Sequence, residues 1–302
     1  MPTFAISLIK IIFSFENKRE TIKNITLNVP EGAIYGFLGP NGAGKSTTIR
    51  LIVGLLKANS GQIKIFDQEL AGNVDIFNRI GTLIEMPSLY EHLTAAQNLE
   101  ITCLLRNIPK TKINEVLTTV KLQDKANVLV RKYSLGMKQR LGIALTLVSD
   151  PDLLILDEPT NGLDPHGIVE IRELLLELKQ KHHKTIFVSS HNLAEIEKIA
   201  DHVGIISKGK MVFEGTIDAL QKLINSDNKV YIETDNPQKA FDLFASTDNV
   251  PIFEQSTLIF SCRDKSEISS IVKKMVDNNL SVFGVSNQKS SLEELFIDLI
   301  GE

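Results

Sequence analysis

One eight-residue stretch restricts the fold of this chain more than any other feature. Residues 39–46 read Gly-Pro-Asn-Gly-Ala-Gly-Lys-Ser and fit the pattern G-x-x-x-x-G-K-[ST]. Residues 33–38 before it predict a strand, and residues 45–56 after it predict a helix. Glycines let the main chain wrap with its N–H groups pointing inward, and the helix start adds the positive end of a dipole. The stretch is therefore typical of a phosphate-binding loop.

Two side chains complete the expected phosphate site. Lys45 is expected to reach the β- and γ-phosphates of a triphosphate, and Ser46 to bind Mg²⁺ through its hydroxyl. A chance match to the pattern is the alternative, and the flanking strand and helix argue against it. The candidate nucleotide-binding residues in this loop are Gly39, Pro40, Asn41, Gly42, Ala43, Gly44, Lys45, Ser46 and Thr47.

Two adjacent carboxylates follow a short apolar run. Leu153–Leu156 predicts a strand covered on both faces, and Asp157 and Glu158 come directly after it. Ligands bind at the carboxyl ends of the strands in open α/β sheets. Because neighbouring strand residues point to opposite sides, we expect Asp157 to hold Mg²⁺ and Glu158 to act as the general base. A solvated strand end is the alternative for such a pair alone.

The composition argues against several other classes of protein. The net charge is −4, so the basic surface typical of nucleic-acid binding is absent and no nucleic-acid partner is expected. Cys103 and Cys262 form neither a disulfide framework nor a metal-ligand cluster. The first residues do not resemble a signal peptide, and no apolar run approaches the roughly 20 residues of a membrane span. We expect a cytosolic chain that does not cross a membrane by itself.

Strands and helices alternate over residues 1–224 and predict an α/β domain with a mostly parallel sheet and antiparallel N-terminal strands. A helical subdomain is expected over about 86–150, with a helical pattern running from 93 to 126. A polar run at 225–228 predicts a domain boundary. Residues 225–302 predict a small α+β domain in the order β-α-β-β-α-β, as in ferredoxin-like folds, with a last helix over 291–300.

Together, these motifs and their order resemble the ATP-binding cassette (ABC) ATPases over residues 4–220. Residues 134–140, Ser-Leu-Gly-Met-Lys-Gln-Arg, stand where the family has its LSGGQ signature. Residues 161–165 look like the family's D-loop, and His191 looks like its switch histidine. The resemblance implies a P-loop NTPase fold of the ABC cassette type that binds ATP and Mg²⁺ and hydrolyses ATP.

The resemblance also implies individual roles on one cassette. Phe15, with Phe13 as second choice, stands where the family stacks an aromatic ring on adenine. His191 would donate to the γ-phosphate and orient Glu158. Without the other motifs, an ordinary surface or buried histidine is the alternative.

In this family two cassettes associate head to tail, and each ATP lies between them. Ser134 and the N–H of Gly136 would then contact the γ-phosphate held by the other cassette, with Asp164 of the D-loop beside it. The second cassette is expected to be another copy of this chain, with a different cassette as the alternative.

Three residues depart from the family pattern. Leu135 and Met137 replace a glycine and the glutamine of the signature. Glu85 stands where the family has glutamine, and we expect it to be a metal ligand and part of the catalytic site. This combination is similar to ABC subunits that export peptide antibiotics such as bacitracin and lantibiotics. A neutral variation is the alternative.

The segment after Glu85 receives a helix of the membrane permease in this family. Residues 86–99 are therefore expected to dock a separate permease through Leu89, Tyr90 and Leu93, with local core packing as the alternative. That docking implies a peripheral protein on the cytoplasmic face of the cell membrane. The C-terminal domain is expected to help dimerisation or permease contact.

Other members of the same superfamily fit the sequence less well. The interval from Glu85 to Tyr133 is too short for the coiled coil of a DNA-repair or chromosome-structuring ATPase. A second Gly-Lys-Ser/Thr loop, as in translation factors, is absent. Export of another substrate (a drug, an ion or a lipid), a non-transport regulatory ATPase and a non-hydrolysing binding module remain as alternatives.

Overall fold

The computed structural model describes residues 3–16, 20–225, 229–245, 247, 249–254, 257–262 and 265–288. The chain divides into two compact units, Met1–Ile217 and Asp218–Glu302. The division between the units therefore comes before the polar run at 225–228 that was predicted as the domain boundary. That run begins where helix α7 (Ile217–Asn225) ends. The helix expected over 291–300 lies outside the described residues.

A six-stranded sheet forms the centre of the first unit, with its strands in the order β10-β9-β3-β8-β7-β6. Neighbours pair in parallel, except β9 and β10, which pair antiparallel. Strands β3, β7 and β8 are buried throughout, as expected for strands covered on both faces. The strands are β3 (Ile34–Leu38), β6 (Ile80–Leu83), β7 (Leu153–Asp157), β8 (Thr185–Ser190), β9 (His202–Ser207) and β10 (Lys210–Thr216).

An antiparallel sheet in the order β2-β1-β4-β5 packs beside the central one. Its strands are β1 (Phe4–Phe13), β2 (Ile22–Pro30), β4 (Ser60–Ile65) and β5 (Gln68–Glu69). Ile6 and Leu27 from this sheet share one hydrophobic core with Ile49 of helix α1 (Lys45–Ile52) and Phe187 of β8. The core therefore fixes α1 and the loop that precedes it.

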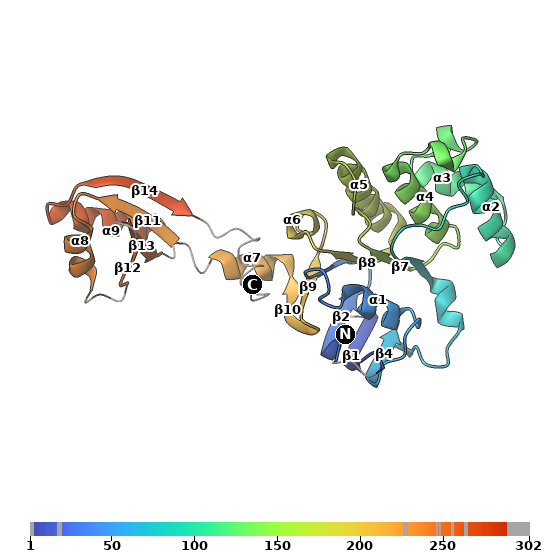
Figure 1. The fold of residues 1–302 in the computed structure, drawn as a ribbon, viewed down its shortest axis with the longest axis horizontal. Helices are drawn as coiled ribbons and strands as arrows, with labels where there is room; N and C mark the ends of the chain where they lie inside the picture. The colour runs from blue at the N-terminus through green and yellow to red at the C-terminus, as the bar shows by residue number, and fades with distance from the viewer. Residues whose placement is uncertain are drawn as a thin grey trace. The chain divides into compact units, whose positions relative to one another are not determined.

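Helices α2 (Ala95–Arg106), α3 (Thr111–Thr119) and α4 (Leu135–Leu147) pack on one another, and Figure 1 shows them together, α2 in teal and the other two in green. The helical pattern predicted from 93 to 126 contains two helices, α2 and α3, with a break between them. Asn107 ends α2 in a left-handed conformation with φ of 55°, and Pro109 lacks the N–H that a continuing helix needs. Short 3₁₀ turns are η1 (Asp75–Arg79), η2 (Gln123–Lys125) and η3 (Val130–Lys132).

The remaining helices of the first unit follow the strands of the central sheet. Helix α5 (Pro165–His182) comes after β7, and the four-residue helix α6 (Leu193–Ile196) comes after β8. None of the described helices combines the length and the apolarity that crossing a bilayer requires.

The second unit contains a four-stranded antiparallel sheet in the order β12-β13-β11-β14. Along β11, Val230 and Ile232 enter a core that also holds Phe244 and Phe260, whose rings lie 4.9 Å apart edge to face. The elements are β11 (Lys229–Thr234), α8 (Pro237–Phe244), β12 (Ile252–Glu254), β13 (Thr257–Ser261), α9 (Lys265–Asp277) and β14 (Val282–Gln288). They follow one another in the order β-α-β-β-α-β.

Candidate functional site

The phosphate loop, residues 39–46, connects β3 to α1. A Cβ on Gly39 would stand 2.4 Å from the carbonyl oxygen of Ile206, so only glycine fits there. Gly44 has φ of 115° immediately before α1, a conformation that favours glycine. The ammonium of Lys45 turns into the loop and donates to the carbonyl oxygens of Gly39 at 2.7 Å and Pro40 at 3.3 Å. Of the other predicted residues, Ala43 is buried, Ser46 and Thr47 are half-buried, and Asn41 and Gly42 are exposed.

The acidic pair lies beside the end of the neighbouring strand β8. Asp157 is 3% exposed and stands in register with Ser189. The Ser189 hydroxyl donates to Oδ1 of Asp157 at 2.5 Å and accepts the N–H of Glu158 at 2.9 Å. Glu158 lies beyond the end of β7 with φ of 49°. A left-handed turn, and not the strand alternation invoked from sequence, therefore sets the direction of the Glu158 side chain.

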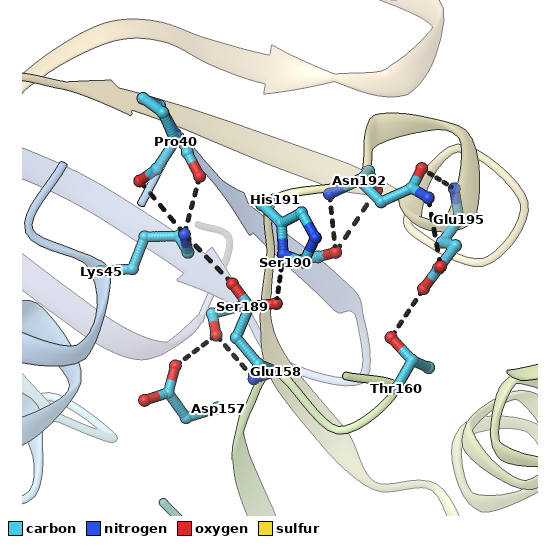
Figure 2. Close-up of polar contacts among 11 residues, drawn as sticks. Pro40, Lys45, Asp157, Glu158, Thr160, Ser189, Ser190, His191, Asn192 and Glu195 are labelled. Carbon is cyan, nitrogen blue, oxygen red and sulfur yellow. Dashed lines mark hydrogen bonds and ion pairs between the residues drawn. The ribbon is translucent and has the colours of Figure 1, made fainter. Parts of the chain in front are cut away.

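The carboxylate of Glu158 lies between a lysine and a histidine, as Figure 2 shows. Nζ of Lys45 is 3.1 Å from Oε1, and Nδ1 of His191 is 2.8 Å from Oε2. The side chain of Glu158 is only 18% exposed, so water screens these contacts weakly. Because β3, β8 and β7 are neighbours in the sheet, the loops that follow them bring these three residues into one cluster.

Ser134 and Asp164 both stand at helix starts. Oγ of Ser134 accepts a main-chain N–H of the first turn of α4 at 3.2 Å. Oδ1 of Asp164 accepts a main-chain N–H of the first turn of α5 at 2.9 Å. Side-chain oxygens in this position satisfy N–H groups that have no partner within the helix. Each residue therefore has a structural role in its own helix.

Gly136 lies on the first turn of α4, near the D-loop. A Cβ on Gly136 would meet nothing closer than Cα of Gly167 at 3.9 Å and Cδ2 of Leu163 at 4.0 Å. Among the residues that the structure describes, no hydrogen bond or ion pair joins residues 134–140 to the phosphate loop. The signature segment and the phosphate loop are therefore not brought together by these contacts.

Glu85 does not join the cluster around Glu158. Its Oε1 lies 2.5 Å from a guanidinium nitrogen of Arg50 on α1, and the Glu85 side chain is 65% exposed. The main chain at Glu85 is left-handed, with φ of 63°. The carboxylate that was expected to bind a metal is therefore paired with an arginine.

Phe15 follows the end of β1 and is 39% exposed, whereas Phe13 is buried. The two rings meet edge to face at 4.9 Å. Thr21, whose N–H donates to the carbonyl oxygen of Phe13, has its own carbonyl oxygen 3.6 Å from the position of a Cβ on Gly44. The chain that carries both phenylalanines therefore passes beside the phosphate loop, and Phe15 is the one with an accessible face.

Comparison with known proteins agrees with these motifs. The family described as "ABC transporter" matches residues 22–161. The bacitracin transport ATP-binding protein BcrA of Bacillus licheniformis is 44% identical over 289 residues, which cover 94% of this chain and 93% of that protein. This chain belongs to the ABC transporter ATP-binding proteins. It is an ABC ATPase, and ATP is its nucleotide.

Two further ABC proteins illustrate the extent of the similarity. The lantibiotic transport ATP-binding protein SrtF of Streptococcus pyogenes is 43% identical over 206 residues, which cover 68% of this chain and 89% of that protein. The structure of cbiO1 from Clostridium perfringens, part of the ABC transporter complex cbiONQ, superposes with a TM-score of 0.68. The two sequences are 26% identical, and the matched region covers 74% of this chain and 93% of the cbiO1 chain. ABC ATPase subunits of this kind dimerise and work with permease partners.

Two residues of this ABC site escaped the sequence analysis. Ser189 contacts both acidic residues, and its position immediately before Ser190 and His191 on a strand parallel to β7 could have revealed it. Arg50 pairs with Glu85, but no spacing in the sequence predicts that contact.

Proposed function

We propose that this chain hydrolyses ATP with Glu158 as the general base. The observation that carries the proposal is the position of the Glu158 carboxylate between Lys45 and His191. Lys45 would bind the β- and γ-phosphates, and Glu158 would accept the proton of the attacking water. His191 would hold the carboxylate in place and donate to the γ-phosphate. Phe15 would stack on the adenine.

The donor set of the site fits Mg²⁺. Ser46 offers a hydroxyl and Asp157 a carboxylate, and oxygen ligands are those that Mg²⁺ prefers. The described residues hold no group of three or more His, Cys, Asp or Glu side chains that could bind a metal alone, so phosphate oxygens and water would supply the other ligands. Glu85 is a third candidate ligand once it leaves Arg50. Bound Mg²⁺ would offset the charge of the phosphates.

The proposed active unit is a head-to-tail dimer, with a second copy of this chain as the expected partner. Ser134 and Gly136 have no contact with the phosphate loop of their own chain among the described interactions, which supports a role toward the other copy. Asp164 would lie at the same interface.

A separate membrane permease is the proposed partner in transport, which would place the chain at the cytoplasmic face of the membrane. Thr82, Pro87 and Arg106 help to line a groove of about 180 Å³ between the central sheet and α4. Tyr90, three residues after Pro87 in the sequence, is 53% exposed, while Leu89 and Leu93 are half-buried. We propose that Tyr90 contacts the permease and that the two leucines pack inside this chain and hold the segment in place.

The proposed transported substrate is a peptide antibiotic of the bacitracin or lantibiotic type, moved outward. The similarity to BcrA runs over 94% of the chain and therefore includes the second unit, which supports a shared role more strongly than the cassette alone would. Export of another amphipathic compound is the alternative. We propose that the second unit contributes to dimerisation or permease contact.

A susceptibility assay tests this proposal. The chain would be expressed with the membrane protein that co-purifies with it, and growth would be measured against bacitracin and a lantibiotic. We expect the parental pair to raise the inhibitory concentration of at least one of them and the pair with Lys45→Ala to leave both unchanged. Equal protection by both pairs would contradict ATP-driven export. No protection by either pair would reject this substrate class.

A further inference from the structure

A short chain of hydrogen bonds joins the segment after β7 to the segment after β8 (Figure 2). The Thr160 hydroxyl donates to Oε2 of Glu195 at 2.6 Å. The side-chain amide of Asn192 donates to Oε1 of Glu195 at 3.2 Å. The two oxygens of one carboxylate are thus bonded to two different loops.

The main chain of Glu195 is also held in place. The main-chain N–H of Glu195 donates to Oδ1 of Asn192 at 3.3 Å, and the main-chain N–H of Asn192 donates to the hydroxyl of Ser190 at 3.0 Å. Leu193 and Ile196 bury the other side of the short helix α6. Glu195 is therefore a fixed point and not a mobile surface side chain.

The two loops joined by Glu195 are those that present Glu158 and His191. Thr160 is two residues after Glu158, and Asn192 is the residue after His191. Neither Glu158 nor His191 lies within a strand, and Glu158 has a left-handed main chain. Sheet pairing therefore ends before both residues, and other contacts must set the 2.8 Å distance between them.

We propose that Glu195 is a positioning residue that keeps Glu158 and His191 in register for hydrolysis. It acts through Thr160 and Asn192 and touches no reacting atom. Thr160 also accepts, at its carbonyl oxygen, the N–H of Leu163 at 3.2 Å, so the same contact reaches the D-loop. The proposal rests on the proposed roles of Glu158 and His191.

Four variants of the full chain test this role, with steady-state ATP hydrolysis and nucleotide affinity as readouts. We expect Glu195→Ala and Thr160→Val each to lower kcat about tenfold, the size of a lost hydrogen bond to a charged group, with less than about twofold change in ATP affinity. Glu195→Gln keeps an acceptor for Asn192 and can donate to Thr160, so kcat should stay within about threefold of parental. Glu173→Ala, which removes an exposed carboxylate of α5, is the control and should leave kcat unchanged.

A double-mutant cycle separates positioning from general destabilisation. If Glu195 acts by aligning His191, adding Glu195→Ala to His191→Ala should lower kcat by less than about twofold further. A full tenfold further loss would overturn the proposal, as would an unchanged kcat in Glu195→Ala or equal losses in Glu195→Gln and Glu195→Ala. If Glu195→Ala unfolds, Thr160→Val decides by the same criteria. If the Glu158→Gln variant hydrolyses ATP at the parental rate, that result instead rejects the proposed role of Glu158.

Discussion

The ammonium of Lys45 lies 3.1 Å from Oε1 of Glu158, inside a loop whose carbonyl oxygens it also contacts. The cation proposed to bind phosphate and the carboxylate proposed to activate water therefore offset each other's charge. Both groups are largely buried, at 6% and 18% exposure of their side chains. The phosphates of ATP would compete with Glu158 for Lys45. Nucleotide binding would therefore weaken the ion pair that Glu158 makes with Lys45.

Replacing Lys45 should weaken ATP binding. For Lys45→Ala we expect the Kd for ATP to rise roughly 10- to 100-fold, because a charge-assisted contact in a partly dry site is lost. Titration with a fluorescent ATP analogue measures the change. The variant should remain folded, because Glu158 keeps its contact with His191, whose side chain is partly exposed. An unchanged Kd would mean that the phosphates bind elsewhere.

Replacing Glu158 should stop turnover without preventing binding. In Glu158→Gln we expect kcat to fall by at least about 100-fold, because an amide cannot accept the proton of the attacking water. ATP should then hold two copies together, which size-exclusion chromatography with ATP and Mg²⁺ would detect. Turnover at the parental rate would exclude Glu158 as the base.

Gly39 and Gly136 should respond to the same substitution in opposite ways. Gly39→Ala would place a Cβ 2.4 Å from a main-chain oxygen, so we expect unfolding free energy to fall by about 1–3 kcal/mol. Gly136→Ala has room, with its nearest neighbour at 3.9 Å, and should change stability little. ATP turnover should nevertheless fall in Gly136→Ala if that surface faces the second copy. Denaturant titration and an ATPase assay test both glycines, and normal turnover in Gly136→Ala would argue against the shared site.

Asp150 should stabilise the fold in a pH-dependent manner. A hydrogen bond from Lys184, at 2.6 Å, lowers the pKa of Asp150 below its ordinary value of 3.8. A lowered pKa stabilises the folded state above the ordinary value, and this contribution is lost as the pH falls through the lowered one. Asparagine tolerates the left-handed φ of 52° at this position, so Asp150→Asn removes mainly the charge. The substitution should lower the free energy of unfolding by about 0.5 kcal/mol at pH 7, a small loss because the Asp150 side of the pair is exposed. Urea titrations at pH 7 and pH 3 measure this loss, and an equal loss at both pH values would contradict the pH dependence.

Sequence patterns predicted the parts of the site that depend on local chemistry. The glycines, Lys45 and the acidic pair are readable because the loop and the buried strand impose those residue types. Central strands β3 and β7 were predicted, at residues 33–38 and Leu153–Leu156. Strands β6, β9 and β10 were not predicted, since Ile80–Leu83 is short and the β9–β10 hairpin lies beyond the last motif.

What sequence could not supply is the direction of side chains at strand ends. Glu85 and Glu158 both have left-handed main chains, which no alternation pattern anticipates. The pairing of Glu85 with Arg50, and the bonds of Ser189 and Glu195, depend on which strands are neighbours. Those contacts join segments that are far apart in the sequence, and they emerge only once the sheet order is known.

The N-cap of α4 explains why a serine suits position 134. A hydroxyl carries one proton and two lone pairs, and the helix uses one lone pair through the N–H of Met137. The proton can therefore point outward, toward an anion in front of the helix. Aspartate would cap α4 equally well but would present a negative charge and no proton to that anion. Among the favoured capping residues, only serine and threonine are neutral and carry an O–H, and serine is the smaller of the two.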